Sequence, residues 1–390
     1  MKKKTNKTAI LMHPGELASR LKTRIDSYLI KYSYLLKRKI AMFPKGIVFV
    51  INENCNAQCS MCDIGTKSNQ THIYKLMSPG AGGYLALGDF KKVIDSVIEK
   101  KPEIWLMGTE PLLYPHFLEA AGYVKNKGLS FLFTSNGILL PKYAQDIVKL
   151  GVKHVLLSVT GGDSASHDKI LGIRGAFDKL IRGLELINAE KMRLGRNNPA
   201  VSFNFVITNQ NYEKLYDHIK ALVALNIDKL TISNTQFITK QMAYAHKLAL
   251  PDDSVTESSV FSYDPTAIDT RLLFQQVRRV FEDFGGFNIA IVPNIRTFSQ
   301  FERYYKQPDK FIRGYKVCYY PWRFAHILPN ADVVVSWRCF SKPLGNIKKD
   351  SFIKIWNDLP IQDFRLKIAK NKGSYPLCSR CGFLWCSYNM

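Results

Sequence analysis

The sequence predicts an α/β fold: a partial, TIM-like barrel of six βα units over residues 46–285, followed by a small α+β domain over residues 286–390. Two observations predict this fold. Between residues 46 and 285, short apolar segments alternate with stretches of helical periodicity, and this alternation is typical of a parallel sheet with crossover helices. The cysteines fall into two groups, one near residue 60 and one beyond residue 317, which marks the carboxy-terminal quarter as a separate module.

The first 45 residues form a basic leader. They contain twelve Lys or Arg residues and only two acidic ones, within a chain whose net charge is +23. Apolar residues recur on one helical stripe between Arg20 and Phe43, so residues 1–45 are predicted to contain a basic amphipathic helix. Such a helix either packs its stripe against the barrel or lies on an anionic membrane surface.

Six strands follow in order, each a short apolar run. The predicted strands are Ile47–Ile51, Ile104–Met107, Ser130–Phe133, His154–Val159, Val201–Ile207 and Lys229–Ser233. The predicted helices between them are 88–100, 115–127, 141–150, 176–193 and 211–226. Residues 234–269 are more polar and follow the last strand; a long segment of this kind is predicted to be either a lid over the active face or disordered.

Polar residues stand where several predicted strands end. In barrels of this type the chemistry gathers at the carboxyl ends of the strands. These ends are Gly108-Thr109-Glu110-Pro111, Thr134-Ser135-Asn136-Gly137 and Ser158-Val159-Thr160-Gly161-Gly162. A bound nucleotide is therefore expected to find its hydrogen-bond partners there.

The most specific motif follows the first strand. Cys55, Cys59 and Cys62 have the spacing Cys-x3-Cys-x2-Cys, which lets three thiolates on one loop ligate a 4Fe-4S cluster, whereas a closed zinc or cluster site normally has four ligands. The missing fourth ligand implies an iron left open for another group. A zinc knuckle or a set of unliganded core cysteines is the alternative.

This triplet, in this position, resembles the radical SAM superfamily. The resemblance implies that the three cysteines hold the catalytic cluster, that S-adenosyl-L-methionine chelates the open iron, and that its reductive cleavage gives a 5′-deoxyadenosyl radical. Gly108-Thr109-Glu110-Pro111 resembles the family's Gly-Gly-Glu-Pro motif, whose role is to hold the amino group of the cofactor; Thr109 replaces the second glycine. The other cofactor contacts that the resemblance implies are Met61, Ser135, Asn136 and Ser158.

A further stretch, from His167 to Phe177, resembles the His-Asp-x-x-Arg-Gly-x-x-Gly-x-Phe segment of the family's peptide- and sugar-modifying members. Leu171 stands where arginine is typical, and Arg174 follows three residues later. The contact made by that arginine is therefore either lost or supplied from a different turn.

The carboxy-terminal cysteines surround a predicted hairpin, Phe324–Leu328 and Val333–Trp337. Two single cysteines and a Cys-x2-Cys pair can supply four ligands to a cluster. The arrangement resembles the SPASM module in its shorter, single-cluster form, called twitch. The resemblance implies an auxiliary 4Fe-4S cluster held by Cys318, Cys339, Cys378 and Cys381, with Cys386 as a spare or alternative ligand; a zinc ribbon is the alternative.

These resemblances imply a radical SAM oxidoreductase in which the auxiliary cluster accepts or relays an electron. The substrate is expected to be a carbohydrate, an aminocyclitol or a lipid-linked molecule, because the leader is short for a peptide-binding domain. A peptide maturase or a nucleic-acid-modifying enzyme is the first alternative, although nucleic acid is the less expected partner despite the charge. A non-catalytic protein with structural metal sites is the second.

The composition also indicates where in the cell the protein is expected to lie. No apolar run approaches the length of a membrane span, and the first residues lack the pattern of a signal peptide. In an intracellular chain, cysteines indicate metal or redox chemistry and not disulfides, because the cytosol keeps thiols reduced. The expected location is the cytoplasm, with peripheral attachment to a membrane as a further option, and the expected electron donor is a protein such as flavodoxin or ferredoxin.

Overall fold

The computed structural model describes most of the chain. The described residues are 25, 28, 32 and 34 and the range 41–389 without 79, 81, 82, 262, 313, 315, 340 and 341. The leader helix predicted within residues 1–45 therefore lies almost wholly outside the described residues. Of its described members, Tyr34 packs edge-on against Tyr319 and Trp322, whereas Ile25, Tyr28 and Tyr32 are exposed.

All the strands belong to one sheet, in the order β10-β9-β8-β1-β2-β3-β4-β5-β6-β7. Strands β1 to β7 are parallel to one another, β8 pairs in parallel with β1, and β9 and β10 continue the sheet in antiparallel fashion. The strands are β1 Gly46–Phe49, β2 Glu103–Leu106, β3 Ser130–Ser135, β4 His154–Val159, β5 Ala200–Ile207, β6 Lys229–Asn234, β7 Ile289–Val292, β8 Phe324–Ile327, β9 Asp332–Val334 and β10 Gly345–Asn346.

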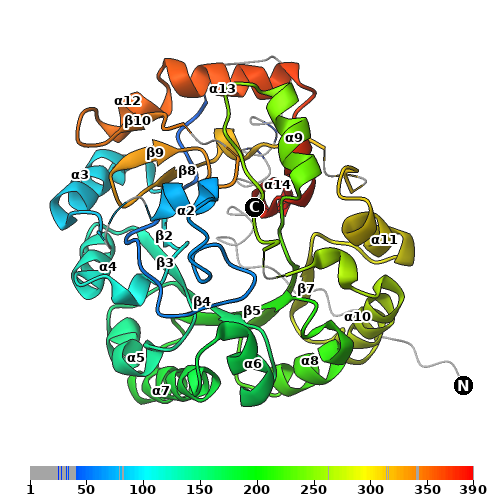
Figure 1. The fold of residues 1–390 in the computed structure, drawn as a ribbon. Helices are drawn as coiled ribbons and strands as arrows, with labels where there is room; N and C mark the ends of the chain where they lie inside the picture. Colours follow the sequence, from blue (N-terminus) through cyan, green and yellow to red (C-terminus); the bar gives the residue numbers. More distant parts are fainter. Residues whose placement is uncertain are drawn as a thin grey trace, which may run out of the picture.

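Helices follow one another around the outside of the curved sheet (Figure 1). The helices of the barrel half are α2 His72–Met77, α3 Leu87–Val97, α4 Phe117–Asn126, α5 Leu140–Lys149, α6 Ser164–Leu171, α7 Ala176–Leu194, α8 Leu215–Val223, α9 Lys240–Ala249, α10 Thr270–Phe284 and α11 Phe298–Lys306. Those of the carboxy-terminal region are α12 Phe352–Trp356, α13 Leu359–Lys370 and α14 Gly382–Asn389. Short 3-10 turns are η1 Ile98–Lys100, η2 Pro111–Leu113, η3 Tyr212–Lys214, η4 Pro265–Ala267, η5 Tyr320–Trp322 and η6 Pro376–Arg380.

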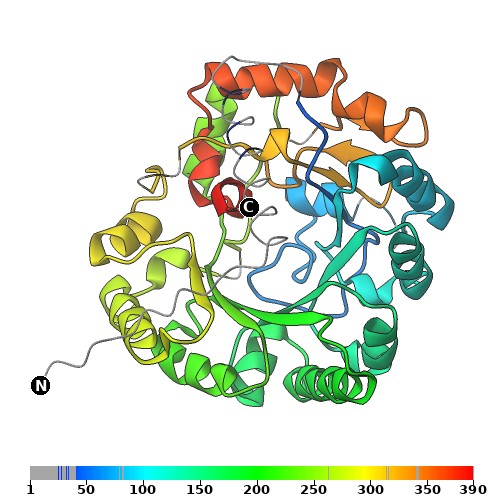
Figure 2. The same ribbon diagram turned by 180° about the vertical axis from the view of Figure 1, so that it is seen from behind.

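The main core lies between the sheet and these outer helices. Phe49, Phe90, Phe117 and Phe131 are fully buried there, since the inner face of each amphipathic helix covers the apolar side of the strands. Helices α2 and α14 lie inside the ring that the outer helices form, as both views show (Figures 1 and 2). Helix α14 begins beside the segment after β6, where Gly382 N donates to Gln236 Oε1, and Ser387 near its end bonds to Tyr319 and Arg323, just before β8.

The predicted α/β fold with a parallel sheet is confirmed, and the sheet is larger than the six predicted strands. Strand β7 escaped prediction because it is short and mostly half-buried, which leaves little apolar pattern. Strand β8, predicted as part of the separate hairpin, pairs with the free edge of β1, from Gly46 opposite Phe324 to Phe49 opposite Ile327. The expected domain boundary at residue 285 falls before β7, so we place the end of the barrel after Val292 as a proposal.

Residues 234–269 form a folded strap across the mouth of the barrel. The segment carries α9, whose first turn is capped by the Thr239 side chain, and a bridge that joins Ile238 to Ser258. The segment is polar because its side chains and backbone form hydrogen bonds with other loops, such as that of Ser258 with Asp63. Within the described part of the chain, no helix is long and apolar enough to cross a membrane.

Candidate active site and auxiliary metal centre

The three cysteines of the first motif lie together on the loop after β1. All three are half-buried. Burial raises the pKa of the Cys55 thiol to about 11, and it raises that of Cys59 well above its ordinary value, with a further rise from the neighbouring Cys62 and Cys55. Three adjacent thiolates repel one another in a partly dry site, so an iron cluster, which neutralises them, fits this donor set.

Helix α6 supports this loop through its backbone. Gln58 N donates to Leu171 O at 2.9 Å, and Ser60 N donates to Ile170 O at 3.2 Å. The Leu171 side chain packs in a small apolar cluster with Ala57, Ile138 and Ala176, against which Cys55 and Cys59 lie. Leu171 therefore packs beneath the cysteine loop, whereas Arg174 is exposed.

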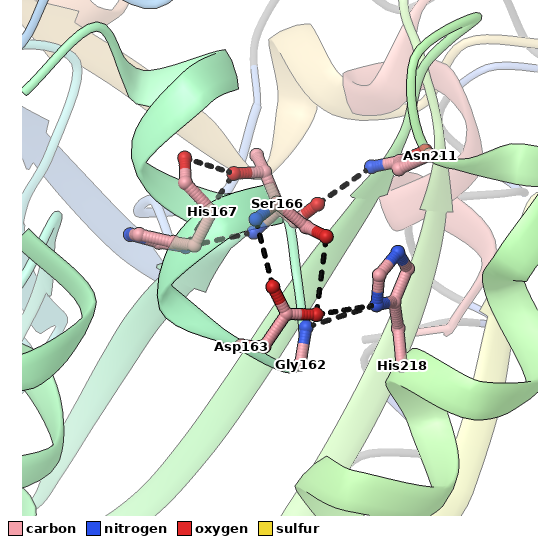
Figure 3. A network of polar contacts seen from close by, with 7 residues as sticks. Gly162, Asp163, Ser166, His167, Asn211 and His218 are labelled. Carbon is pink, nitrogen blue, oxygen red and sulfur yellow. Dashed lines mark hydrogen bonds and ion pairs between the residues drawn. The ribbon is translucent and has the colours of Figure 1, made fainter.

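The remaining polar groups of this stretch organise the loops after β4 and β5 (Figure 3). Thr160 N donates to Nδ1 of His167 at 3.2 Å, and Gly162 N donates to Nδ1 of His218 at 3.2 Å. Asn211 reaches Thr160 O at 2.9 Å through its side-chain amide. These contacts hold the carboxyl ends of neighbouring strands together, so this network is a support and not a second reaction site.

Glu110 is the polar centre of the neighbouring strand ends. Its Oε1 accepts from Leu112 N at 3.0 Å and from the Ser135 hydroxyl at 2.9 Å, and its Oε2 accepts from Asn136 N at 2.8 Å. Only 1% of the residue is exposed, and this burial raises the pKa of its carboxyl group to about 7, against the opposing effect of the three donors. Glu110 thus joins the end of β2 to the end of β3.

The backbone before Glu110 is tied to the cysteine loop through Asn52. The Asn52 amide donates to Glu110 O at 2.9 Å, and the Thr109 hydroxyl donates to Asn52 O at 2.8 Å. Asn136 adds a direct link, since its side-chain amide lies 3.7 Å from the Cys55 sulfur and 2.8 Å from Asn56 Oδ1. The structure therefore brings Thr109, Glu110 and Asn136 to one side of the cysteine triplet.

Gly108 occupies a backbone conformation that few other residues adopt. Its φ is +111°, and an added Cβ would lie 2.9 Å from Met77 Cε and 3.0 Å from Val50 Cγ2. We expect Gly108→Ala to lower the free energy of unfolding by about 1–3 kcal/mol through backbone strain alone, measured by chemical denaturation. Gly88→Ala is the matched control, because its added Cβ meets open space; equal midpoints for the two variants would contradict the expectation.

The other residues predicted to contact the cofactor are Pro111, Met61 and Ser158. Pro111 begins the turn η2 and is buried. Met61 and Ser158 are half-buried, the former packed on the main core and the latter on β4 opposite Asn204. The structure gives these two side chains no contact with Glu110 or Asn136 among the described residues, so their roles rest on the family resemblance.

The four predicted auxiliary ligands surround one cavity. It is lined by Cys318, Cys339, Cys378 and Cys381 together with His246, Tyr320 and Tyr375. Burial raises the pKa of the Cys378 thiol to about 12 and that of Cys381 in the same direction. Cys386 lies on α14 near Cys381, whose proximity raises its pKa further, but it does not line the cavity.

Arg380 fixes the Cys-x2-Cys turn. Its guanidinium is buried and donates to the carbonyl oxygens of Arg303, Tyr304 and Gln307 at 2.6–2.8 Å, where α11 ends with unpaired carbonyls. Cys378 and Cys381 are thus attached to the barrel half. Gly382 N, which donates to Gln236 Oε1 at 2.9 Å, makes a second attachment to the segment after β6.

Arg338 lies between the two groups of cysteines. It is 8% exposed, and its Nη2 has no hydrogen-bond partner among the described residues. Its positive charge lowers the pKa of both Cys62 and Cys381. Arg338 could not be predicted from the sequence, because one arginine beside a cysteine carries no local signal.

Removal of this charge is expected to affect both metal sites. A guanidinium beside thiolate ligands stabilises the added electron of a reduced cluster, so Arg338→Gln should lower the reduction potential of both clusters by on the order of tens of millivolts. Redox titration followed by electron paramagnetic resonance (EPR) measures the shift. Arg338→Lys keeps a charge there and should shift less; potentials that stay unchanged in Arg338→Gln would refute the electrostatic role.

The donor sets fit iron–sulfur clusters at both positions. In the described part of the chain, no three His, Cys, Asp or Glu side chains are grouped to hold a single metal ion. The auxiliary thiols instead line a cavity, and the first three thiols lie beside an open set of polar strand ends. Such a cluster with three protein ligands would leave one iron available for a further group.

Comparison with known proteins identifies two domains in this chain. The model for the radical SAM superfamily matches residues 49–222, and the model for the SPASM iron–sulfur cluster-binding domain matches residues 318–382. Both cysteine motifs lie within the matched residues. The radical SAM and SPASM domains imply a catalytic 4Fe-4S cluster, S-adenosyl-L-methionine and auxiliary iron–sulfur binding.

Relatives with assigned activities differ in what they act on. An AdoMet-dependent heme synthase of Methanosarcina barkeri is 30% identical over 37% of this chain and 39% of its own length. A PqqA peptide cyclase of Granulibacter bethesdensis is 24% identical over 50% of this chain and 48% of its own. The chain thus spans less than half the length of these relatives.

Structural similarity extends over nearly the whole chain. SuiB of Streptococcus suis, solved with its precursor peptide SuiA, has a TM-score of 0.60 at 16% identity and covers 99% of this chain and 78% of that protein. At this identity the similarity establishes the fold. The chain carries a radical SAM domain over residues 49–222 and a SPASM domain over residues 318–382.

Proposed function

We propose that this protein uses S-adenosyl-L-methionine to start a radical reaction on a peptide, with Cys55, Cys59 and Cys62 as the ligands of its catalytic cluster. When bound, the cluster and the cofactor supply a 5′-deoxyadenosyl radical, which takes a hydrogen atom from the substrate. The observation that carries the proposal is the joining of the cysteine loop to Glu110 through Asn52 and Asn136.

The polar strand ends are proposed to hold the cofactor. Three of the four acceptor positions of the Glu110 carboxylate are used by protein donors, which leaves one on Oε2 for the amino group of the cofactor. Ser135 and Asn136 fix that carboxylate. Gly108, Thr109 and Pro111 form the adjacent backbone, and Met61 and Ser158 would contact the rest of the cofactor.

The carboxy-terminal cavity is proposed to hold the auxiliary cluster through Cys318, Cys339, Cys378 and Cys381. A substrate radical formed in a dry site needs an acceptor for its unpaired electron if the net reaction is an oxidation. An auxiliary cluster on the far side of Arg338 would serve as that acceptor. A flavodoxin or ferredoxin is proposed as the external reductant, and peripheral attachment to a membrane stays a prediction.

A peptide substrate is supported by the comparisons more than the carbohydrate, aminocyclitol or lipid-linked substrate expected from the sequence. A PqqA peptide cyclase is among the relatives, and SuiB, solved with a precursor peptide, shares the fold. The buried Arg338, with an unused donor near both cysteine groups, would hold an acidic group of such a peptide.

The test uses 5′-deoxyadenosine formation by the anaerobically reconstituted, dithionite-reduced protein. Extract of the producing cells is separated by size, and each fraction is added before and after treatment with protease. Stimulation that protease destroys is the expected result. Stimulation that survives protease treatment would mean that the substrate is a small molecule and not a peptide. Bound zinc, with no product from any fraction, would refute the radical chemistry itself.

A further inference from the structure

The strap formed by residues 234–269 is attached to both cysteine groups. Asp63, next to Cys62, accepts from the Ser258 hydroxyl at 2.7 Å and from Ser259 N at 3.0 Å. On the auxiliary side, α9 packs against the turn η6 that carries Cys378. The strap therefore brings side chains of its own to the auxiliary cavity.

His246 of α9 is the side chain that the strap adds to the cavity lining. It is 1% exposed, and its ring packs edge-on against Tyr375 with centroids 5.4 Å apart. Its Nε2 lies 3.0 Å from Oδ2 of Asp253, whose side chain is also fully buried. Its Nδ1 has no partner among the described residues.

This combination needs an explanation. Folded proteins rarely leave a buried polar atom without a hydrogen-bond partner. The Asp253 carboxylate accepts a hydrogen bond from Nε2–H and fixes the ring, so Nδ1 is the ring nitrogen left for a partner in the cavity. The other side chains of the cavity wall are thiols and apolar or aromatic groups, apart from Ser336.

We propose that His246, protonated on both ring nitrogens, donates a hydrogen bond from Nδ1 to a sulfur of the auxiliary cluster and one from Nε2 to the Asp253 carboxylate, which holds the ring in that position. The inference rests on the proposed function, because it requires the cavity to hold that cluster. A hydrogen bond to a cluster sulfur stabilises the reduced state. His246 is thus a positioning residue that raises the reduction potential and makes the cluster a better electron acceptor.

The experiment isolates the auxiliary cluster in the full-length chain by changing Cys55, Cys59 and Cys62 to Ala. The reduced cluster is examined by electron spin echo spectroscopy with natural and ¹⁵N-labelled histidine, and by EPR-monitored redox titration. We expect a weak nitrogen modulation that changes with the label. His246→Leu should remove it, retain the iron and move the potential to a more negative value.

Two further variants test the role of Asp253 and provide a control. Asp253→Asn should move the potential in the same direction, because the imidazole loses its fixed orientation. His154→Leu is the matched control, since His154 starts β4 at the opposite end of the barrel strands and bonds Ser202 at 2.8 Å; neither the modulation nor the potential should change.

Three results would overturn the inference. They are the absence of a histidine signal, the strong coupling of a direct iron–nitrogen bond, and an unchanged potential in His246→Leu. The labelling experiment leaves His246 in place, so a folding defect of the variant cannot decide the outcome. A chain that takes up no auxiliary cluster at all would overturn the proposed function as well, and so separates the two failures.

Discussion

Replacement of Cys59 by alanine is expected to abolish 5′-deoxyadenosine formation. Cys59 is the middle cysteine of the triplet, is proposed as a cluster ligand, and lies within electrostatic reach of both Cys55 and Cys62. A cluster with two protein ligands and no fixed third position cannot hold an iron open for the cofactor. The product should fall to the level of protein without iron, and bound iron should fall from about eight to about four atoms per chain.

Two measurements check this result. Product is quantified after reduction with dithionite, and iron is measured on the same sample. Cys386→Ala is the matched control, because Cys386 is a half-buried cysteine that does not line the auxiliary cavity, and both values should stay near those of the unchanged chain. Product formed by Cys59→Ala at the native rate would mean that the radical does not originate at this triplet.

The two cysteine motifs were predictable because their signals are local. Cys55, Cys59 and Cys62 stand on one loop, and the same is true of the Cys378 and Cys381 pair. The polar strand ends were predictable for a related reason. The carboxyl ends of parallel strands meet at one edge, so Glu110 and Asn136 had to lie near each other once the βα order was known, and they lie 2.8 Å apart in a hydrogen bond.

The contacts that join the two halves carry no such signal. Asp63 and Ser258 are 195 residues apart in the chain. Strands β1 and β8 pair although more than half of the chain lies between them. A serine, a lone histidine or a lone arginine has many structural uses, and only the fold reveals which side chain it meets. His246, Asp253 and Arg338 therefore became candidates only when their buried positions beside the cysteines were known.

The strap formed by residues 234–269 lies beside both cysteine groups. It contacts Asp63 next to the first group and carries His246, which lines the cavity of the second. His72, whose Nδ1 accepts from Thr256 N at 3.1 Å, also reaches the carbonyl of Arg338 at 3.4 Å. The strap therefore joins the surroundings of both cysteine groups through one piece of chain.

The second large effect is expected at Glu110, where Glu110→Gln should weaken the binding of S-adenosyl-L-methionine and remove its pH dependence. The amide keeps one acceptor oxygen but places an N–H where Leu112 N or Asn136 N now donates. One buried donor then lacks an acceptor, at a cost of about 1–3 kcal/mol in the free energy of unfolding. Where the amide nitrogen takes the place of Oε2, the acceptor position that we assign to the cofactor's amino group is lost as well.

The pH dependence follows from the raised pKa of about 7 of the Glu110 carboxyl group. In the free protein the folded state holds this proton more tightly than the unfolded state, so the carboxyl group lowers stability as pH rises from about 4.5 to about 7. The ammonium of the cofactor favours the ionised carboxylate. Affinity should therefore rise with pH to about 7 and then level off, and should weaken roughly tenfold for each pH unit below it.

Calorimetric titration of the reconstituted protein with S-adenosyl-L-methionine, from about pH 6 to about pH 8.5, measures this profile. Glu119→Gln provides the control, since Glu119 is 54% exposed and pairs with Lys91 and His116 at the surface, so its profile should match that of the unchanged chain. A pH dependence that persists in Glu110→Gln would assign the titrating group elsewhere. Because Ser135 and Asn136 both depend on this carboxylate, the loss should extend to the geometry beside Cys55 and should lower product formation even at saturating cofactor.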